Sequence, residues 1–399
     1  MDDQLLSVPP WRRWVILFTL CWMPLPMNFA VASILAAAPE VAADFSVSTT
    51  TISTANAGVF AAMTISPLIW FPIGSLVGRR TTYLTAACLL CLCSIGAALA
   101  PTLAAFISIW IVGGTTGIVF LVSGQTIVAD IFEPIVRGRA VGLFMGSHVS
   151  AQMIAPLTGG ILATYTTWRA IYGLQAGMTL IGLILAFFYV PNDIPKPSHS
   201  RSEPGSKARF GTMIKLFSPC PVFKILRYPD ILLSNISCGL LSFNIYGILS
   251  AVRFAISERF DFSSPQSSSL FLLAPGTGFV FGSILGGMFS DHTVKRYIVK
   301  REGVRLPRDR LRAGLITMLL ILPGGNLVLG WSLQEKVGGM TLPAAGTFAA
   351  GFGLMASFSS LNTYAAAAIA ATLSGVMVLG VITYKPSSEA ASDSDRSIA

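Results

Sequence analysis

The sequence predicts an all-α protein that spans a membrane about eleven times. Three observations predict this class: 53% of the 399 residues are hydrophobic, only 11% are charged, and the mean hydropathy is +0.69. A water-soluble domain with so few charges could not cover its own surface with polar groups. Lipid is therefore the expected surrounding for most of the chain, and helices are the expected elements, because a helix satisfies its own backbone groups in hydrocarbon.

Each predicted span is an apolar run of about 20 residues, the length at which a helix crosses ~30 Å of hydrocarbon. The runs lie at 14–37, 56–77, 82–100, 104–128, 140–163, 169–190, 229–252, 268–289, 313–332, 341–362 and 365–384. The first run follows Arg12 and Arg13, as the core of a signal peptide would. Its apolar stretch is longer than such a core and ten more runs follow, so we interpret it as a transmembrane helix.

The basic residues predict the orientation of these helices. Of the 27 Lys and Arg residues, 21 lie in one alternate set of loops and flanks. Short loops rich in Lys and Arg stay on the cytoplasmic side, so the N-terminus is expected inside the cell. The basic residues that flank the spans account for the net charge of +9. Because the basic residues are not gathered on one face, the expected macromolecular surrounding is the lipid bilayer, and no nucleic-acid partner is expected.

The chain divides into two predicted halves. Residues 1–191 form an expected six-helix bundle, 192–228 a polar cytoplasmic linker, 229–384 a bundle of about five helices, and 385–399 a polar tail. The second run ends in "WFPIGSLVGRR" and the eighth in "GGMFSDHTVKR". An offset of 216 residues aligns Arg79 with Lys295 and Arg80 with Arg296. The two halves therefore resemble repeats of one unit.

Two motifs resemble those of a known family. "GSLVGRR" is similar to the loop between helices two and three of the major facilitator superfamily, and "APLTGG" resembles the Gly-Pro-x-x-Gly-Gly motif of its antiporters. The strings "VADIFEPIVRGRAVG" and "TTWRAIYGLQ" lie where the family has similar ones. Over almost its whole length the chain resembles fungal drug:proton antiporters of the twelve-span group. The resemblance implies the major facilitator fold of two pseudo-symmetric bundles and a monomer without a cofactor.

The resemblance assigns conformational roles to both motifs. The gating residues that it implies are Gly74, Ser75, Gly78, Arg79, Arg80, Asp291, Lys295 and Arg296. Ser75 replaces the usual acid of the first copy, whereas Asp291 keeps an acid in the second, so the first latch is expected to be weaker. The alternative is that the basic residues only anchor helix ends at the headgroups. In the fifth run, Ala155, Pro156, Gly159 and Gly160 are expected to seal the contact between the halves, or else to serve ordinary close packing.

Polar side chains inside the spans are the candidates for a substrate path, because a polar group facing lipid costs free energy. The predicted cavity residues are Asn28, Gln125, Gln152, Asn244, Tyr246, Phe358 and Asn362. The resemblance places spans one, four, seven and ten around the cavity; the alternative for each polar residue is a hydrogen bond between helices. His148 is the candidate for proton coupling, because it is ionisable near neutral pH and lies inside an apolar run. A structural role is the alternative for His148.

Other chemistry is not expected from this sequence. There is no P-loop, no constellation typical of hydrolases and no cysteine spacing that gathers metal ligands, so neither catalytic residues nor a metal is predicted. The expected function is proton-coupled efflux of a small organic compound, such as a fungal secondary metabolite, toxin or drug, across the plasma membrane. The alternatives are uptake of a nutrient such as a polyamine, ammonium or an organic acid, and a membrane protein that transports nothing.

The odd number of spans leads to a last expectation. After "LNTY", only "AAAAIAATLSGVMVLGVITY" precedes the polar tail, whereas the family has two further helices. We therefore expect that about one loop and one helix of the family pattern are missing near Tyr364 and Ala365, so that the second half has no equivalent of helix eleven. The predicted topology has eleven spans and an external C-terminus, or a last segment that packs imperfectly.

Overall fold

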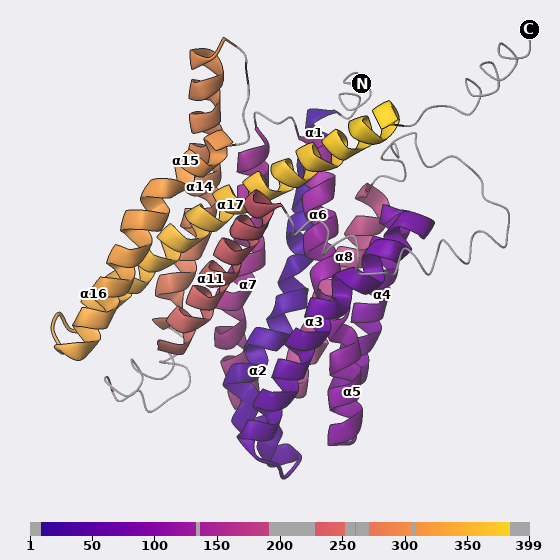
Figure 1. The fold of residues 1–399 in the computed structure, drawn as a ribbon. Helices are drawn as coiled ribbons and strands as arrows, with labels where there is room; N and C mark the ends of the chain where they lie inside the picture. The colour runs from indigo at the N-terminus through magenta and orange to yellow at the C-terminus, as the bar shows by residue number, and fades with distance from the viewer. Residues whose placement is uncertain are drawn as a thin grey trace, which may run out of the picture.

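The computed structural model describes residues 9–132, 136–190, 228–251, 260, 271–302, 304 and 308–383. Regular structure in these residues is helical, without a strand (Figure 1). The helices are α1 (Pro10–Trp22), α2 (Pro24–Asp44), α3 (Thr49–Val77), α4 (Arg79–Ala98), α5 (Leu103–Gly114), α6 (Gly117–Ile131), α7 (Arg137–Tyr165), α8 (Arg169–Tyr189), α11 (Pro229–Ala251), α14 (Leu273–Lys300), α15 (Arg308–Ile316), the π-helical turn η4 (Thr317–Ile321), α16 (Leu322–Gln334) and α17 (Thr341–Thr383).

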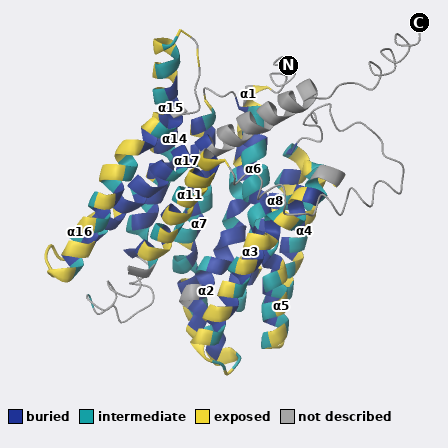
Figure 2. Cartoon of the chain, in the orientation of Figure 1, coloured by how far each residue is buried: buried dark blue, intermediate teal, exposed yellow. Residues whose placement is uncertain are grey.

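Ten stretches of the described helices are long and apolar enough to cross a membrane. In chain order, spans one to ten are Trp11–Ile34, Thr49–Gly74, Arg79–Ala98, Leu103–Ile131, Arg137–Tyr165, Arg169–Tyr189, Ile231–Leu249, Leu273–Lys300, Asp309–Gln334 and Thr341–Asn362. Large apolar side chains of these spans, such as Phe71, Phe243 and Leu327, are more than 70% exposed, as expected for lipid contact (Figure 2). The predicted all-α membrane class is confirmed.

Three spans are irregular where the sequence interrupts the hydrogen bonding of a helix. Span one breaks at Met23, directly before Pro24, which has no N–H to donate. Span four breaks at a turn of Thr115 and Thr116, between α5 and α6. In span nine, η4 lies just before Pro323, whose ring would clash with the carbonyl four residues earlier in a regular α-helix. None of these breaks was predicted.

Two main clusters of buried apolar side chains form the interior, and a third is limited to Phe271 and Leu329. The larger is built from α1 to α8, and the smaller from α11, α14, α16 and α17 together with Val149 of α7. Phe358 of α17 packs against both clusters. Most of the predicted linker 192–228 and all of the tail 385–399 lie outside the described residues, so the proposed domain limits stay a prediction.

The end of the second half differs from the expectation. α17 is one helix from Thr341 to Thr383, and it passes through Tyr364 and Ala365 without a turn (Figure 1). The predicted division into a tenth and an eleventh span at this junction is therefore wrong, because both are parts of one helix. The physical reason is local: the alanine-rich stretch after Tyr364 has high helix propensity and contains no Gly or Pro near the junction. The missing equivalent of helix eleven stays a prediction.

Candidate functional site

Helix α7 joins the two halves, because it packs on α2 of the first and on α14 of the second (Figure 1). Its contact with α14 is backbone against backbone. A Cβ atom added at Gly142 would lie 2.6 Å from the carbonyl oxygen of Ser283, and one added at Gly287 would lie 2.4 Å from that of Gly138. The Ser283 hydroxyl also donates to the Gly142 carbonyl at 2.7 Å. Only glycine permits this approach on both helices.

Asp291 completes this contact at the predicted cytoplasmic end. Its two carboxylate oxygens accept hydrogen bonds from the backbone N–H groups of Gly138 at 2.9 Å and Arg139 at 2.8 Å. These donors belong to the first turn of α7 and have no partner within the helix. The Arg310 guanidinium lies 3.5 Å from the same carboxylate, and both side chains are buried. Asp291 therefore binds the positive end of a helix dipole across the two halves.

The first-half copy of the motif makes different contacts. Gly78 forms the turn between α3 and α4 with a φ of +104°, a conformation that favours glycine. Arg79 forms an ion pair with Asp130 at the end of α6, and Arg80 donates to the carbonyl of Phe187 in α8. These partners belong to the first half. The backbone carbonyl of Gly74 accepts a hydrogen bond from the N–H of Gly78 at 3.1 Å.

The remaining motif residues are placed as follows. The Ser75 side chain lies outside the described part of the chain. Lys295 and Arg296 are exposed on the last turns of α14, where solvated cations are expected at a headgroup surface. Of the eight predicted gating residues, Asp291 is thus the one for which the structure gives a hydrogen bond across the halves.

The small residues of the fifth span contact α2. Ala155 is fully buried, and its carbonyl accepts a hydrogen bond from Ser33 of α2 at 2.7 Å. A Cβ at Gly159 would lie 2.7 Å from Cβ of Ser33. Both residues therefore pack within the first half, in agreement with the alternative of ordinary close packing, and the expected seal between the halves stays a prediction. Pro156 is half-buried and Gly160 is buried on the same helix.

Two groups of predicted residues meet near the centre of the protein. The first is a pair: the Asn28 amide of α2 donates to Nδ1 of His148 in α7 at 2.8 Å, while the same amide nitrogen also lies 3.3 Å from the Pro24 carbonyl. An amide nitrogen is a donor only, so Nδ1 accepts and the proton of neutral His148 is on Nε2. The pair joins span one to span five.

The second group joins three spans through a sulfur atom. The amides of Gln125 in span four and Asn362 in span ten donate to Sδ of Met145 at 3.7 Å and 3.8 Å. Met145 is buried, and a thioether is a weak acceptor. One side chain of α7 thus connects an amide of the first half with an amide of the second.

The other predicted cavity residues have separate surroundings. The carbonyl oxygen of Gln152 is buried without a hydrogen-bond partner in the described residues. Asn244 accepts from the Asn326 amide at 3.4 Å, a bond between spans seven and nine. The ring of Tyr246 meets that of Phe60 edge to face at 5.8 Å, which joins span seven to span two. Phe358 is half-buried between the two apolar clusters.

Several functional contacts were missed by sequence reasoning. Gly138, Gly142 and Gly146 repeat at intervals of four residues, and this spacing is the known signal for close packing of transmembrane helices. Asn326 is a polar residue inside the ninth predicted run, so the criterion that indicated Asn244 applied to it as well. Met145 had no comparable signal, because methionine is common inside a span.

Similarity to known proteins agrees with this arrangement. The family model of the Major Facilitator Superfamily matches residues 20–383. Among curated proteins, "Efflux pump FUBT" of Fusarium oxysporum is 24% identical over 91% of this chain, and "Multidrug transporter DTR1" of Candida glabrata is 23% identical over 75%. "Dityrosine transporter 1" of Saccharomyces cerevisiae is 25% identical over 74%. The chain spans 63%, 62% and 59% of the lengths of these relatives.

Solved structures show the same fold. The proton:xylose symporter XylE matches with a TM-score of 0.56 at 14% identity, over 88% of this chain and 85% of the symporter. The human organic anion transporter MFSD10 matches with a TM-score of 0.56 at 16% identity, over 90% of this chain and 92% of that protein. The family match, the helical architecture and these neighbours lead to one conclusion: this chain is a multi-pass membrane protein that belongs to the major facilitator superfamily.

Proposed function

We propose that the protein exports a small organic compound by alternating access, in exchange for protons. One observation carries the proposal: polar side chains from spans one, four, five and ten meet in two groups beside the boundary between the halves, and one group bridges it. Polar groups at membrane depth are expensive and typically mark a substrate or ion path. The similarity to fungal efflux pumps supports the direction of transport.

The amides of Gln125 and Asn362 are the proposed binding groups for substrate. Their acceptor, the Met145 sulfur, forms weaker hydrogen bonds than an oxygen does. A carbonyl, hydroxyl or carboxylate oxygen of a substrate would therefore displace the sulfur at little cost. The buried carbonyl of Gln152 offers an acceptor for a substrate donor. Since Gln125 and Asn362 belong to different halves, a compound bound to both would hold them together until the halves move.

His148 is the proposed site of proton exchange. Nδ1 of neutral His148 accepts a hydrogen bond from the Asn28 amide. When Nδ1 binds a proton it becomes a donor, so two donors then lie opposite each other. The Asn28 amide must then rotate or withdraw. Protonation would thereby alter the contact between α2 and α7, and α7 is the helix that packs on the second half. This sequence of events would link proton binding to movement of the halves.

We further propose that the protein acts in the plasma membrane and as a monomer, as the family resemblance implies. Because the chain spans less than two thirds of the length of relatives such as "Efflux pump FUBT", their activity is attributed to it only as a proposal. Uptake of a nutrient and absence of transport are the competing possibilities, and the following experiment separates them.

The test uses purified protein in liposomes that enclose the pH indicator pyranine. A panel of aromatic carboxylic acids, phenols and organic cations is added outside at equal pH on both sides. An exchanger expels protons as a compound enters, so the internal pH should rise; a proton-coupled uptake transporter would lower it. His148→Gln should abolish the pH change while leaving exchange of the compound itself. His292→Gln, which alters an exposed histidine, is the control.

The outcomes bear on separate parts of the proposal. A fall in internal pH would contradict exchange, and no response to any compound would contradict transport of these classes. A normal pH change in His148→Gln would remove His148 from the proton path without affecting the assignment of the protein as an exporter.

A further inference from the structure

The break in span four lies at membrane depth, where backbone groups need partners. Side chains supply part of this need. The Trp70 indole N–H donates to the Thr115 carbonyl at 2.9 Å, and the Thr116 hydroxyl donates to the Gly113 carbonyl at 2.8 Å. Thr116 is fully buried. Trp70 of α3 and Thr116 therefore satisfy backbone carbonyls at the break.

A small cavity adjoins this break, inside the first half and apart from the residues discussed above. Gly113, Gly114 and Gly117, which flank the break, form part of its wall. Methionine and valine side chains of α2 and α3 form another part, and α4 and α8 contribute the polar residues Ser94, Tyr172 and Gln175. The cavity has room for about one water molecule. No residue of its wall is charged.

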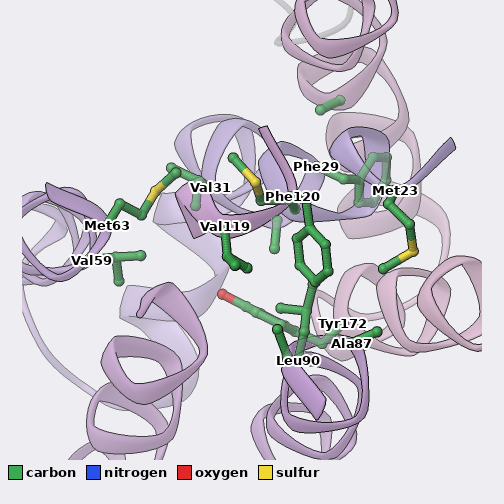
Figure 3. Close-up of a cluster of buried hydrophobic side chains, with 14 of the residues drawn as sticks. Met23, Phe29, Val31, Val59, Met63, Ala87, Leu90, Val119, Phe120 and Tyr172 are labelled. Carbon is green, nitrogen blue, oxygen red and sulfur yellow. The ribbon is translucent and has the colours of Figure 1, made fainter. Parts of the chain in front are cut away.

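Tyr172 directs a polar group into this cavity. Its side chain is 1% exposed, and its hydroxyl oxygen has no hydrogen-bond partner among the residues that the structure describes. Figure 3 shows the hydroxyl pointing from α8 towards Val59 and Val119, while the ring lies beside Leu90 and Phe120. The ring is fixed by edge-to-face contacts, at 5.4 Å from Phe106. The hydroxyl therefore cannot turn away to find another partner.

Ser94 of α4 and Gln175 of α8 offer acceptors for a bridging molecule in the cavity. The Ser94 hydroxyl donates to the Leu90 carbonyl at 2.7 Å, which leaves its oxygen lone pairs free to accept. The Gln175 amide nitrogen donates to the Pro26 carbonyl at 2.9 Å, which orients this side chain. A molecule in the cavity can thus accept from Tyr172 and donate to Ser94 or Gln175. Water has the size and the two kinds of hydrogen-bonding group that this requires.

We propose that the cavity is a binding site for one internal water molecule, held between Tyr172 of α8 and the polar residues of α4 and α8 beside the break in span four. An ion is disfavoured because the wall carries no charge to compensate it. The water would satisfy the Tyr172 hydroxyl and connect α8 with α4 at the point where α5 gives way to α6. This site does not depend on the proposed transport function.

Thermal unfolding of the purified protein tests the proposal, because the proposal predicts whether the melting temperature of a variant falls or rises. If water binds the hydroxyl, Tyr172→Phe loses that hydrogen bond, and the melting temperature should fall. Tyr83→Phe is the matched control. Tyr83 is also fully buried, its hydroxyl also lacks a partner among the described residues, and its ring packs edge to face on Phe120 at 5.1 Å, but it does not line the cavity. Removing its unsatisfied hydroxyl should raise the melting temperature.

The proposal would be overturned if the melting temperature of Tyr172→Phe were unchanged or raised while that of Tyr83→Phe rose. The Tyr172 hydroxyl would then behave as a buried polar group without a hydrogen-bond partner. A high-resolution structure gives an independent measurement. It should show a density peak within hydrogen-bonding distance of Tyr172 Oη in the wild-type protein and none in Tyr172→Phe. A wild-type map that shows other internal waters but not this one would also refute the site.

Discussion

The carboxylate of Asp291 accepts the backbone N–H of Gly138 at 2.9 Å, so an acid of the second half caps a helix of the first. The bond depends on the absence of a side chain at residue 138, because a Cβ there would lie 2.3 Å from the same carboxylate oxygen. Gly138 and Asp291, which are far apart in the sequence, therefore form one contact between α7 and α14. The motif acid needs a glycine at the start of α7, and the repeat of glycines along α7 brings α14 close enough to provide the acid.

Gly138→Ala should weaken this contact. The new Cβ would meet the Asp291 carboxylate and, at 2.8 Å, the Gly287 carbonyl, so α7 and α14 must separate. Overpacking of this kind costs about 1–3 kcal/mol, which is a shift of roughly 5- to 150-fold between two conformations. In a protein without native cysteines, Cys introduced at buried Ser290 should react faster with an impermeant maleimide from the cytoplasmic side.

The matched control is Gly177→Ala on α8, where an added Cβ would have no neighbour within 4 Å. It should leave the maleimide rate unchanged. Equal rates in the Gly138 variant and the control would show that the contact does not hold the two helices together.

Asp291→Asn should open the same interface by a different route. The amide keeps one oxygen that can accept, but its NH₂ group would face a helix N–H, and the negative charge at the α7 dipole and beside Arg310 is lost. Hydrogen bonds to charged groups contribute about 1.5–3 kcal/mol. We expect faster labelling at residue 290. Asp130→Asn, which removes the Arg79 ion pair within the first half, should not change that rate.

The spans were predictable because their hydropathy is strong, and most predicted positions agree with the helices within several residues. The exceptions are the eighth, whose helix continues eleven residues beyond the predicted end at 289 to Lys300, and the eleventh, which is part of α17. The irregularities of the spans were not predictable. The turn at Thr115 and Thr116 lies in "GGTTG", a cluster of weak helix formers whose small residues scarcely interrupt the hydropathy of the run. Hydropathy predicts whether a segment lies in lipid, but it does not predict where the backbone departs from a helix. The interruption is stabilised by Trp70, a residue 45 positions earlier, so the information lies in tertiary contacts.

It was harder to predict which side of α7 contacts which neighbouring helix. A transmembrane helix is apolar on all sides, so it has no polar face to reveal which side meets a partner. Small residues at Gly138, Gly142 and Gly146 and at Ala155 and Gly159 mark two stripes, one for α14 and one for α2. The sequence marks both as close contacts but does not assign their partners. The pairing of Asn28 with His148 likewise required coordinates, although each residue was a predicted candidate.

Ala155→Leu should destabilise the first half and leave the interface between the halves intact. Ala155 is completely buried against α2, where its carbonyl binds Ser33. Three additional carbon atoms have no space there, so the unfolding free energy should fall by about 1–3 kcal/mol. Thermal unfolding measures this, with Ile154→Leu at a largely exposed neighbouring position as the control. Faster labelling at residue 290 without a loss of stability would instead return Ala155 to the contact between the halves.

The outer end of the first half should show a pH-dependent contribution to stability. Asp44, which lies beyond span one, accepts hydrogen bonds from Arg169 at 2.6 Å and from the Trp168 indole at 3.0 Å, and these bonds lower the pKa of its carboxyl. Because the pKa is lower in the folded state, the contribution is fully present above the ordinary carboxyl pKa of about 4. It is lost as the pH falls through the folded-state value.

Asp44→Asn isolates this contribution from all other titrations. The melting temperature of the wild-type protein should exceed that of Asp44→Asn by a constant small amount above about pH 5, because both partners of the ion pair are partly exposed. The difference should shrink as the pH falls below about 4. Arg169→Gln provides the complementary test: without the guanidinium, the same substitution at Asp44 should have less effect at neutral pH. A difference that grows on acidification would have the wrong sign and would refute the assignment of the lowered pKa to these bonds.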